Sequence, residues 1–516
     1  MKHIHFALLI LASLTASLAT ASESVTISRS VLLDKIKGGW AGQMIGVVYG
    51  APTEFRSNGK ILTWDLAWKP GSLKDSLNQD DLYVEMTFAK VMDDLGLDAT
   101  TQQFGEAFRT SKYSLWHANA GARRALALGI PAPLSGNPKY NFHANDIDFQ
   151  IEADFIGLMC PGLPRESNRY CSRVGHVMNY GDGVYGGMFV TGMYAAAFTE
   201  SDPRRLVETG LACLPAESEY AQLLRDVLRW SAQYPQDWTK VWQLIDDRWT
   251  KQDPCPDGFL TEFNIDAKVN GAYIALGLLY GGGDFAKTME IATRCGQDSD
   301  CNPSSAAGVI GVVLGYSRIP ELYRKEVPPM ADEKFSFTNY SFNDIVRSTE
   351  TRALKVIQLA GGAITADAVQ IPVQTPQPAA LEQWNPGVPD RRIAVTDSAW
   401  QFSGKWEDSK QDNKRISRQS HCAGNEATLR FSGVAIAITG SMHPAGGRAE
   451  VYLDGKKQDF PLDAFNDEKT HDNVVWQIYG LPSAEHTLRI VTTDQALPQS
   501  KGSEVTLATA VVFRAP

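Results

Sequence analysis

Carboxylate side chains occur at three points of the sequence where a turn is followed or preceded by a helical pattern. Asp298 and Asp300 lie one residue apart in the Gly-rich stretch CGQDSDCNPSS, and Asp80 and Asp81 are adjacent in NQDDLYVEM. Glu54 ends a Gly-rich segment in GAPTEF. Carboxylate oxygens are the ligands that hard divalent cations such as Mg²⁺ and Mn²⁺ prefer. These positions predict metal-assisted chemistry, provided that the fold brings them together.

Helix capping is the alternative explanation for each acidic position, because an Asp near a helix N-terminus accepts backbone N–H bonds and interacts favourably with the helix dipole. All three positions, however, adjoin segments of small residues, which predict helices that pack centrally. Several carboxylates in one cleft repel one another strongly unless a cation compensates them. A cluster of this size predicts two divalent cations, magnesium or manganese, rather than one.

The elements that would position these residues have a helical pattern over residues 24–362. Apolar residues recur at helical spacing in stretches such as DDLYVEMTFAKVMDDLG and VNGAYIALGLLYG, and Gly ends each of them. Gly38, Gly42, Gly46 and Gly50 are spaced four apart, so that in a helix they form one face that admits a neighbouring backbone. The pattern predicts a compact all-α domain with tightly crossing helices.

The helical pattern ends at a Pro-rich stretch. Residues 363–390 lack periodicity, which predicts a linker or an extended connector across a surface. Over residues 391–516, stretches such as ATLRFSGVAIAITG and HTLRIVTT alternate apolar with polar residues between Gly and Asp-Gly turns. This alternation predicts a second domain, an antiparallel β-sandwich.

The first 21 residues have the pattern of a secretory signal peptide. Lys2 precedes an apolar run over residues 6–18, and small residues at 19–21 form a cleavage site. A buried core helix is the alternative, which the terminal position and the small-residue end disfavour. We therefore expect an exported protein, located in the periplasm or outside the cell.

Composition and cysteine count narrow the function classes further. The formal net charge of −10 argues against a nucleic-acid partner, because no basic surface is available to neutralise phosphates. After the N-terminus there is no apolar stretch long enough to span a membrane. The seven cysteines are odd in number, so at least one thiol is unpaired, and Cys160 with Cys171 or Cys295 with Cys301 are candidate disulfides.

Four stretches occur in an order that resembles the ADP-ribosylglycohydrolase family. They are GGWAGQMIGVVYGAPTEF, NQDDLYVEM, GHVMNYGDGVYGG and CGQDSDCNPSSAAGVIGVVLG, and the resemblance covers most of residues 31–318. It implies an all-α fold with a binuclear magnesium or manganese centre that holds a ribose while the bond at its anomeric carbon is hydrolysed. Carried over to this sequence, the resemblance implies the metal-binding residues Glu54, Asp80, Asp81, Asp298 and Asp300.

Two positions depart from the pattern of the family. Gln79 and Cys301 stand where the family has hydroxyl residues ahead of the first acidic pair and after the second. A Gln carbonyl still binds a hard metal, whereas a Cys thiol is soft and suits manganese or zinc better than magnesium, or makes no metal contact at all. We include both residues among the predicted metal-binding positions, and they indicate a divergent branch.

The middle of the chain supplies candidate substrate-binding residues. Asp148 and Glu152 are four residues apart, with an exposed polar helix face as the alternative. The Gly-rich loop GHVMNYGDGVYGG resembles the family loop that lines the substrate cleft, with a plain turn around one buried His as the alternative. Its candidate residues are His176, Asn179, Tyr180, Gly181, Asp182 and Tyr185.

These observations predict a secreted, metal-dependent glycosidase that acts on a furanosyl sugar. The cations would orient ring hydroxyls, and Glu54 or Asp81 would accept the proton of the attacking water. The sandwich resembles the jelly-roll modules of secreted carbohydrate-active enzymes, which favours an extracellular glycan or glycoconjugate substrate. Its aromatic residues would either present a sugar-binding surface or fill a core: Trp400, Trp406, Trp476 and Tyr479. A hydrolase of ADP-ribosyl-protein or ADP-ribosyl-arginine and a non-catalytic carbohydrate-binding protein are the alternatives.

Overall fold

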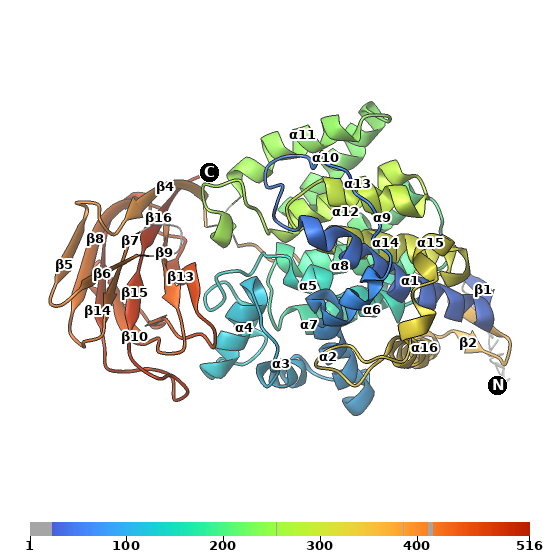
Figure 1. Cartoon of the computed structure of the whole chain (residues 1–516), viewed down its shortest axis with the longest axis horizontal. Helices are drawn as coiled ribbons and strands as arrows, with labels where there is room; N and C mark the ends of the chain where they lie inside the picture. The colour runs from blue at the N-terminus through green and yellow to red at the C-terminus, as the bar shows by residue number, and fades with distance from the viewer. Residues whose placement is uncertain (1–22, 254, 385, 411–415) are drawn as a thin grey trace, which may run out of the picture.

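The computed structural model describes residues 23–253, 255–384, 386–410 and 416–516. The predicted signal peptide, residues 1–21, lies outside the described residues. Figure 1 shows a helical domain beside a β-sandwich formed by the C-terminal part of the chain. The predicted fold class, an all-α domain followed by an antiparallel β-sandwich, is confirmed. Within the described residues, no helix is long and apolar enough to cross a bilayer.

Sixteen α-helices are found among the described residues, and they form the first domain. Their bounds are α1 (Arg29–Gly50), α2 (Asp80–Leu95), α3 (Thr101–Arg109), α4 (His117–Ala127), α5 (Asp148–Ile151), α6 (Asp154–Leu158), α7 (Pro164–Gly175), α8 (Asp182–Ala197), α9 (Pro203–Ala212), α10 (Glu219–Gln233), α11 (Trp238–Arg248), α12 (Ala267–Gly281), α13 (Phe285–Arg294), α14 (Cys301–Leu314), α15 (Glu321–Arg324) and α16 (Phe342–Leu359). Helices α8, α12 and α14 are buried along almost their whole length and α1 from Gly38 onward, so they form the centre of this domain.

The Gly face of α1 packs against α14, as the four-residue spacing predicts. A Cβ atom built on Gly42 would lie 2.2 Å from the carbonyl oxygen of Ala307, and one on Gly46 would lie 2.2 Å from that of Pro303. Only glycine permits this approach of two backbones. Because Gly38 meets Gly311 and Gly46 meets Pro303, the two helices are antiparallel, and the end of α1 lies beside the start of α14.

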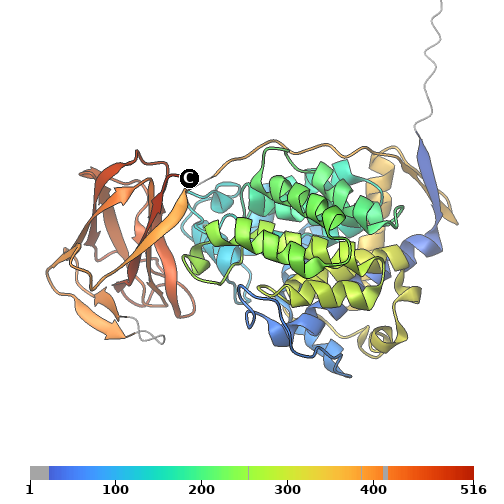
Figure 2. The ribbon, with the colours of Figure 1, turned by 90° about the horizontal axis from the view of Figure 1, so that it is seen from above.

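The predicted linker, residues 363–390, contains ordered structure at both of its ends. Strands β2 (Ala363–Ile364) and β3 (Ala368–Pro372) form a three-stranded antiparallel sheet with β1 (Ser24–Ser28), in the order β1-β3-β2. The chain then runs in an extended form across the helical domain, as Figure 2 shows, and reaches β4 (Val388–Ala394). The absence of periodicity reflects this extended path, but it concealed the two short strands.

The sandwich is built from antiparallel strands in the orders β11-β10-β14-β8-β5, β13-β9-β16-β4 and β15-β7-β6, with β12 pairing with β10. The bounds are β5 (Trp400–Ser403), β6 (Glu407–Lys410), β7 (Ile416–Ser420), β8 (Glu426–Gly433), β9 (Ala435–Met442), β10 (Arg448–Leu453), β11 (Lys456–Lys457), β12 (Leu462–Asp463), β13 (Thr470–Ile478), β14 (Ala484–Thr492), β15 (Val505–Leu507) and β16 (Thr509–Arg514). Trp400 and Trp476 are 6% and 2% exposed and fill the core between the sheets, so neither presents a sugar-binding surface.

All seven cysteines are free thiols, and six of them are buried. The candidate disulfides Cys160–Cys171 and Cys295–Cys301 are therefore not formed. The thiol groups have other partners: Cys171 Sγ lies 3.2 Å from Thr191 Oγ1, and Cys301 Sγ lies 3.3 Å from Asp81 Oδ2.

Candidate active site

The antiparallel pair α1 and α14 brings Glu54 to the second acidic pair. A Cβ atom on Gly50 would lie only 2.0 Å from the carbonyl oxygen of Ser299, so the end of α1 rests directly on the turn between Asp298 and Asp300. Thr53 Oγ1 and Ser299 Oγ share a hydrogen bond of 2.7 Å, which ties the two turns together. The glycine spacing that packs the helices therefore also positions the carboxylates.

A cavity of about 570 Å³ lies where these turns meet the N-terminus of α2. Asp80 and Asp81 are the first residues of that helix, and Gln79 is its N-cap. Apolar rings of Phe55, Trp116 and Phe263 contribute to the wall. The predicted site residues that line the cavity are Glu54, Gln79, Asp80, Asp148, Asp298, Asp300 and Cys301.

The side chain of Asp300 in this cavity is not a helix cap. Asp300 is the N-cap residue of α14, yet its side chain makes no capping hydrogen bond. Asp300 Oδ1 and Asp81 Oδ1 are buried and accept no hydrogen bond from any described residue. The ligand atoms of Asp298, Asp300 and Cys301 lie within 4.8 Å of one another. Buried oxygens without donors, close together, fit the requirement of a hard divalent cation for carboxylate ligands.

Burial raises the pKa of every carboxyl group in this set, and repulsion by neighbouring carboxylates raises it further for all of them except Asp300. The pKa of Asp80 rises to about 6 through burial and the nearby Asp300, and burial with the same neighbour raises the pKa of Glu54 to about 8. Burial is also the first cause for Asp81, Asp298 and Asp300, whose pKa values are raised. Without a cation the cluster therefore holds protons, which a bound divalent ion would displace.

Cys301, one of the two departures from the family pattern, binds a carboxylate of the cluster. Its thiol donates a hydrogen bond to Asp81 Oδ2 over 3.3 Å. Burial and the surrounding carboxylates raise the pKa of the thiol well above its ordinary value, so the group stays protonated and acts as a donor. Cys301 thus orients Asp81, which is itself fully buried behind the cavity wall.

Asp148 and Glu152 are buried, so the exposed-face alternative does not describe them. Asp148 lines the cavity and accepts hydrogen bonds from the backbone N–H groups of Ala118 and Asn119, at 3.0 and 2.9 Å. Glu152 lies behind it and accepts a hydrogen bond from the Asn119 side chain. Both carboxyl groups have raised pKa values, chiefly because they are buried.

The Gly-rich loop over residues 176–185 does not line the acidic cavity. His176 Nε2 lies 2.9 Å from Glu382 Oε1, the Gly181 N–H donates to Glu382 Oε2 over 3.0 Å, and Tyr185 donates to the Ala380 carbonyl over 2.8 Å. Residues 380–382 belong to the extended connector, so this part of the loop anchors the connector to the helical domain.

The remaining residues of that loop also lie away from the acidic cavity. Asn179 is buried, and its side-chain amide donates hydrogen bonds to the backbone carbonyls of Ala144 and Asp146. The Tyr180 ring contacts the edge of His176. Asp182 lines a separate cavity of about 610 Å³ that also contains Lys268. The sequence predicted that all six loop residues line the substrate cleft, but in the fold they lie away from the acidic cavity.

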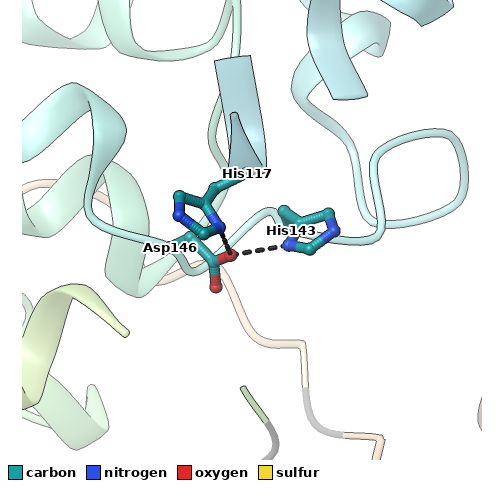
Figure 3. Close-up of side chains that lie close together, drawn as sticks. All are labelled: His117, His143 and Asp146. Carbon is teal, nitrogen blue, oxygen red and sulfur yellow. Dashed lines mark hydrogen bonds and ion pairs between the residues drawn. The ribbon is translucent and has the colours of Figure 1, made fainter. Parts of the chain in front are cut away.

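A cluster of two histidines and one aspartate adjoins the acidic cavity and was missed by the sequence analysis. Asp146 Oδ2 lies 2.6 Å from His143 Nδ1 and 3.9 Å from His117 Nδ1, as Figure 3 shows. The His117 ring lines the acidic cavity. The backbone of His117 has a φ of 42°, which is uncommon for a residue other than glycine, and such backbone conformations recur at functional sites. No local motif marks the cluster, because His117 and Asp146 are distant in sequence.

The helical part of the chain is similar to a known protein family. The model of a family described as ADP-ribosylglycohydrolase matches residues 28–350. A solved structure titled "ADP-ribosylglycohydrolase-related protein complex" is 14% identical, with 64% of this chain and 99% of that chain covered and a TM-score of 0.42. No curated protein matches the chain in a sequence search.

Two further solved structures have similarity to a smaller part of the chain. The CBM36-1 domain of a multidomain xylanase from the hindgut metagenome of Trinervitermes trinervoides is 9% identical, with 23% of this chain and 94% of that chain covered and a TM-score of 0.18. A two-domain esterase active on acetylated mannans is 15% identical, with 33% and 46% covered and a TM-score of 0.20. The family match, in contrast, spans more than half of the sequence. The chain therefore belongs to the ADP-ribosylglycohydrolase family.

Proposed function

We propose that this protein is an exported, metal-dependent glycosidase that hydrolyses the anomeric bond of a furanosyl sugar in an extracellular glycan or glycoconjugate. Membership of the ADP-ribosylglycohydrolase family supports a glycohydrolase-type function. The observation that carries the metal dependence is the convergence of buried carboxylates, including Asp298 and Asp300, in one cavity. Export rests on the N-terminal signal-peptide pattern, and a glycan substrate rests on the attached sandwich.

The carboxylates divide into residues that would hold cations and one that would accept a proton. Asp80, Asp298 and Asp300 face the cavity and, with Asp81 behind them, would hold two divalent ions. Bound divalent cations supply positive charge that orients sugar hydroxyls and polarises the reacting bond. Glu54 lies at the rim of the cavity, where it is partly desolvated by its surroundings but still reaches solvent, so it is the better candidate to accept the proton of the attacking water.

His117 is placed to hold a proton for the departing oxygen of the substrate. Its imidazole lines the cavity, and Asp146, whose Oδ2 lies 3.9 Å from His117 Nδ1, stabilises a positive charge on the ring. His117→Gln should slow hydrolysis of a furanosyl disaccharide about a hundredfold and slow that of the matching glycosyl fluoride far less, because fluoride leaves without protonation. Equal losses on both substrates would assign the ring a purely structural role.

ADP-ribosyl-arginine or ADP-ribosyl-protein hydrolysis is the second candidate function, favoured by the family to which the chain belongs. A binder without catalysis is disfavoured, because a decayed site has no physical reason to retain so many buried, mutually repelling carboxylates.

The discriminating experiment is a parallel activity screen of the purified chain with Mg²⁺, with Mn²⁺ and with EDTA. ADP-ribosyl-arginine, ribofuranosides and arabinofuranosides are the substrates, and Asp300→Ala is the inactive control. We expect release of a furanose that requires the divalent ion. Turnover of ADP-ribosyl-arginine alone would replace the glycan proposal, and undiminished turnover in EDTA would remove the metal from it.

A further inference from the structure

A second cavity, of about 220 Å³, lies between the helical domain and the sandwich. It adjoins the acidic cavity directly, since Leu115, Trp116 and His117 line both. The helical wall includes Tyr140 and Phe142, and the sandwich wall includes Asn466, Thr470 and Asn473. The far wall of this interdomain cavity, which lies next to the acidic cavity, therefore belongs to the second domain.

The chemistry of this interdomain cavity suits a neutral sugar ring. Aromatic side chains on one wall face hydroxyl and amide groups on the other, a combination that binds the apolar face and the hydroxyl groups of a sugar. Trp116 is 50% exposed although it lines both cavities. Thr470 Oγ1 is buried and has no hydrogen-bond partner among the described residues, so it is available to a ligand.

A phosphate-bearing ligand fits the interdomain cavity less well. Arg124 is the arginine in its wall, and its guanidinium already donates to the Asp463 carbonyl and contacts Met442 Sδ. An oligophosphate requires several free cationic groups or a row of backbone donors. At about 220 Å³ the cavity is also below the usual size of pockets for drug-sized ligands, which leaves room for a single ring.

The two walls are held in place by contacts elsewhere in the interface. Arg392 Nε donates to the Phe259 carbonyl over 2.9 Å, and the rings of Phe259 and Phe513 lie 5.2 Å apart, edge to face. Gln477 Nε2 donates to the Pro138 carbonyl over 3.2 Å. These contacts fix the position of the sandwich, including β13 with Thr470 and Asn473, relative to the helical domain.

We propose that the substrate is a neutral oligosaccharide or polysaccharide that spans both domains: the furanosyl ring occupies the acidic cavity, and the next sugar, on the leaving-group side, occupies the interdomain cavity. This inference rests on the proposed glycosidase function and adds a substrate class to it. It assigns sugar binding to the face of β13 that meets the helical domain rather than to an outer surface of the sandwich.

The test compares two substrates of one glycone, arabinofuranobiose and arabinofuranosyl fluoride, with the wild-type enzyme, a T470V/N473A variant and a T428V control. Thr428 lies on β8 in another sheet of the sandwich and lines neither cavity. Only the disaccharide places a sugar in the interdomain cavity. We expect the double substitution to lower kcat/KM for the disaccharide about tenfold, to leave the fluoride within about twofold, and T428V to change neither.

Each remaining outcome decides the inference separately from the proposed function. Equal effects on both substrates, or no effect on the disaccharide, overturn the interdomain subsite although the enzyme is a glycosidase. If the wild type cleaves neither substrate, the enzyme does not hydrolyse arabinofuranosides, and calorimetric titration with arabinofuranobiose decides the subsite. Binding that T470V/N473A abolishes and Asp298→Ala retains supports the subsite. Absence of binding to the wild type overturns it.

Discussion

Two buried acidic clusters in the helical domain differ in where their compensating charge comes from. In the first, Lys268 Nζ lies 3.3 Å from a carboxylate oxygen of Asp253 and 3.4 Å from one of Asp266 and one of Glu219. The Lys268 side chain is buried, with 3% of its surface exposed. In the second, the cavity with Asp298 and Asp300, no ion pair between described residues reaches these carboxylates.

This difference separates a structural cluster from a binding cluster. Asp253 and Asp266 hold the Lys268 ammonium, and together they raise its pKa well above the ordinary value despite burial. The cation that stabilises this cluster is part of the chain. Asp298 and Asp300 have only each other and further acids as close charged neighbours, so the charge that would stabilise their ionised form must come from outside.

The largest effect is expected at the cluster that we propose binds an external cation. Asp298→Ala should lower kcat/KM by at least about a thousandfold, or about 4 kcal/mol, and should abolish binding of Mg²⁺ and Mn²⁺ at the same time. The cation-free variant should be no less stable than the cation-free wild type, because one of several repelling carboxyl groups is gone. Kinetics, calorimetric titration with Mn²⁺ and thermal unfolding in EDTA measure the three quantities. Full activity in the variant would remove Asp298 from the site.

Removing the Lys268 ammonium should have the opposite effects: a loss of stability and no change in metal binding. Lys268→Met leaves Asp253 and Asp266 buried without their partner and should lower the free energy of unfolding by about 3–5 kcal/mol. Excess Mg²⁺ should not restore this loss, and Mn²⁺ affinity at the acidic cavity should stay unchanged. Denaturant unfolding with and without Mg²⁺ checks the prediction, with the exposed Lys240→Met as the matched control. A rescue by Mg²⁺ would mean that both clusters bind external cations.

The carboxyl groups of the acidic cavity should make the stability of the cation-free protein depend on pH. The pKa of Asp80 is raised to about 6 and that of Glu54 to about 8, so the folded chain binds these protons more tightly than the unfolded chain does. The cation-free protein therefore loses stability as the pH rises from about 4 towards 8, over the interval between the unfolded and the folded pKa values. Mg²⁺ should replace the lost protons, so its stabilising effect should be larger at pH 8 than at pH 5.

Thermal unfolding at both pH values, with EDTA and with excess Mg²⁺, measures this effect. We expect the ion to raise Tm at pH 8 by a few degrees and to have little effect at pH 5. Asp298→Ala serves as the control, because it should lose the increase in Tm caused by Mg²⁺ and keep the pH dependence of Tm that comes from all other groups. The same increase in the variant would place the stabilising ion elsewhere.

The sequence was informative where one local pattern served both packing and chemistry. The spacing of Gly38 to Gly50 predicted a close helix pair, and that pair also brings Glu54 to Asp298 and Asp300. The predicted metal-binding positions therefore lie together, because each acidic motif sits at the end of a helix whose packing the small residues specify.

The sequence was uninformative where a contact joins segments that are distant along the chain. His176, Gly181 and Tyr185 form a Gly-rich loop typical of a ligand site, but their partners are Ala380 and Glu382 on the connector, roughly 200 residues later. Trp400 and Trp476 look the same in sequence whether they face a core or a sugar. The cluster of His117, His143 and Asp146 likewise depends on tertiary contacts that no local pattern specifies.

The smallest expected effect concerns Cys301. Cys301→Ala removes the donor to Asp81 Oδ2 and leaves that buried carboxylate without its hydrogen bond, which should weaken Mg²⁺ binding about five- to tenfold. Cys301→Ser keeps a donor and offers an oxygen in place of sulfur, so it should bind Mg²⁺ at least as tightly as the wild type. Calorimetric titration with Mg²⁺, Mn²⁺ and Zn²⁺ compares the three proteins. If the thiol acts only as a hydrogen-bond donor, the wild type and Cys301→Ser should have the same order of affinity for the three ions. A selective loss of Zn²⁺ affinity in the serine variant would instead show that the sulfur is itself a metal ligand. The cation of this cluster would then be a softer ion than Mg²⁺.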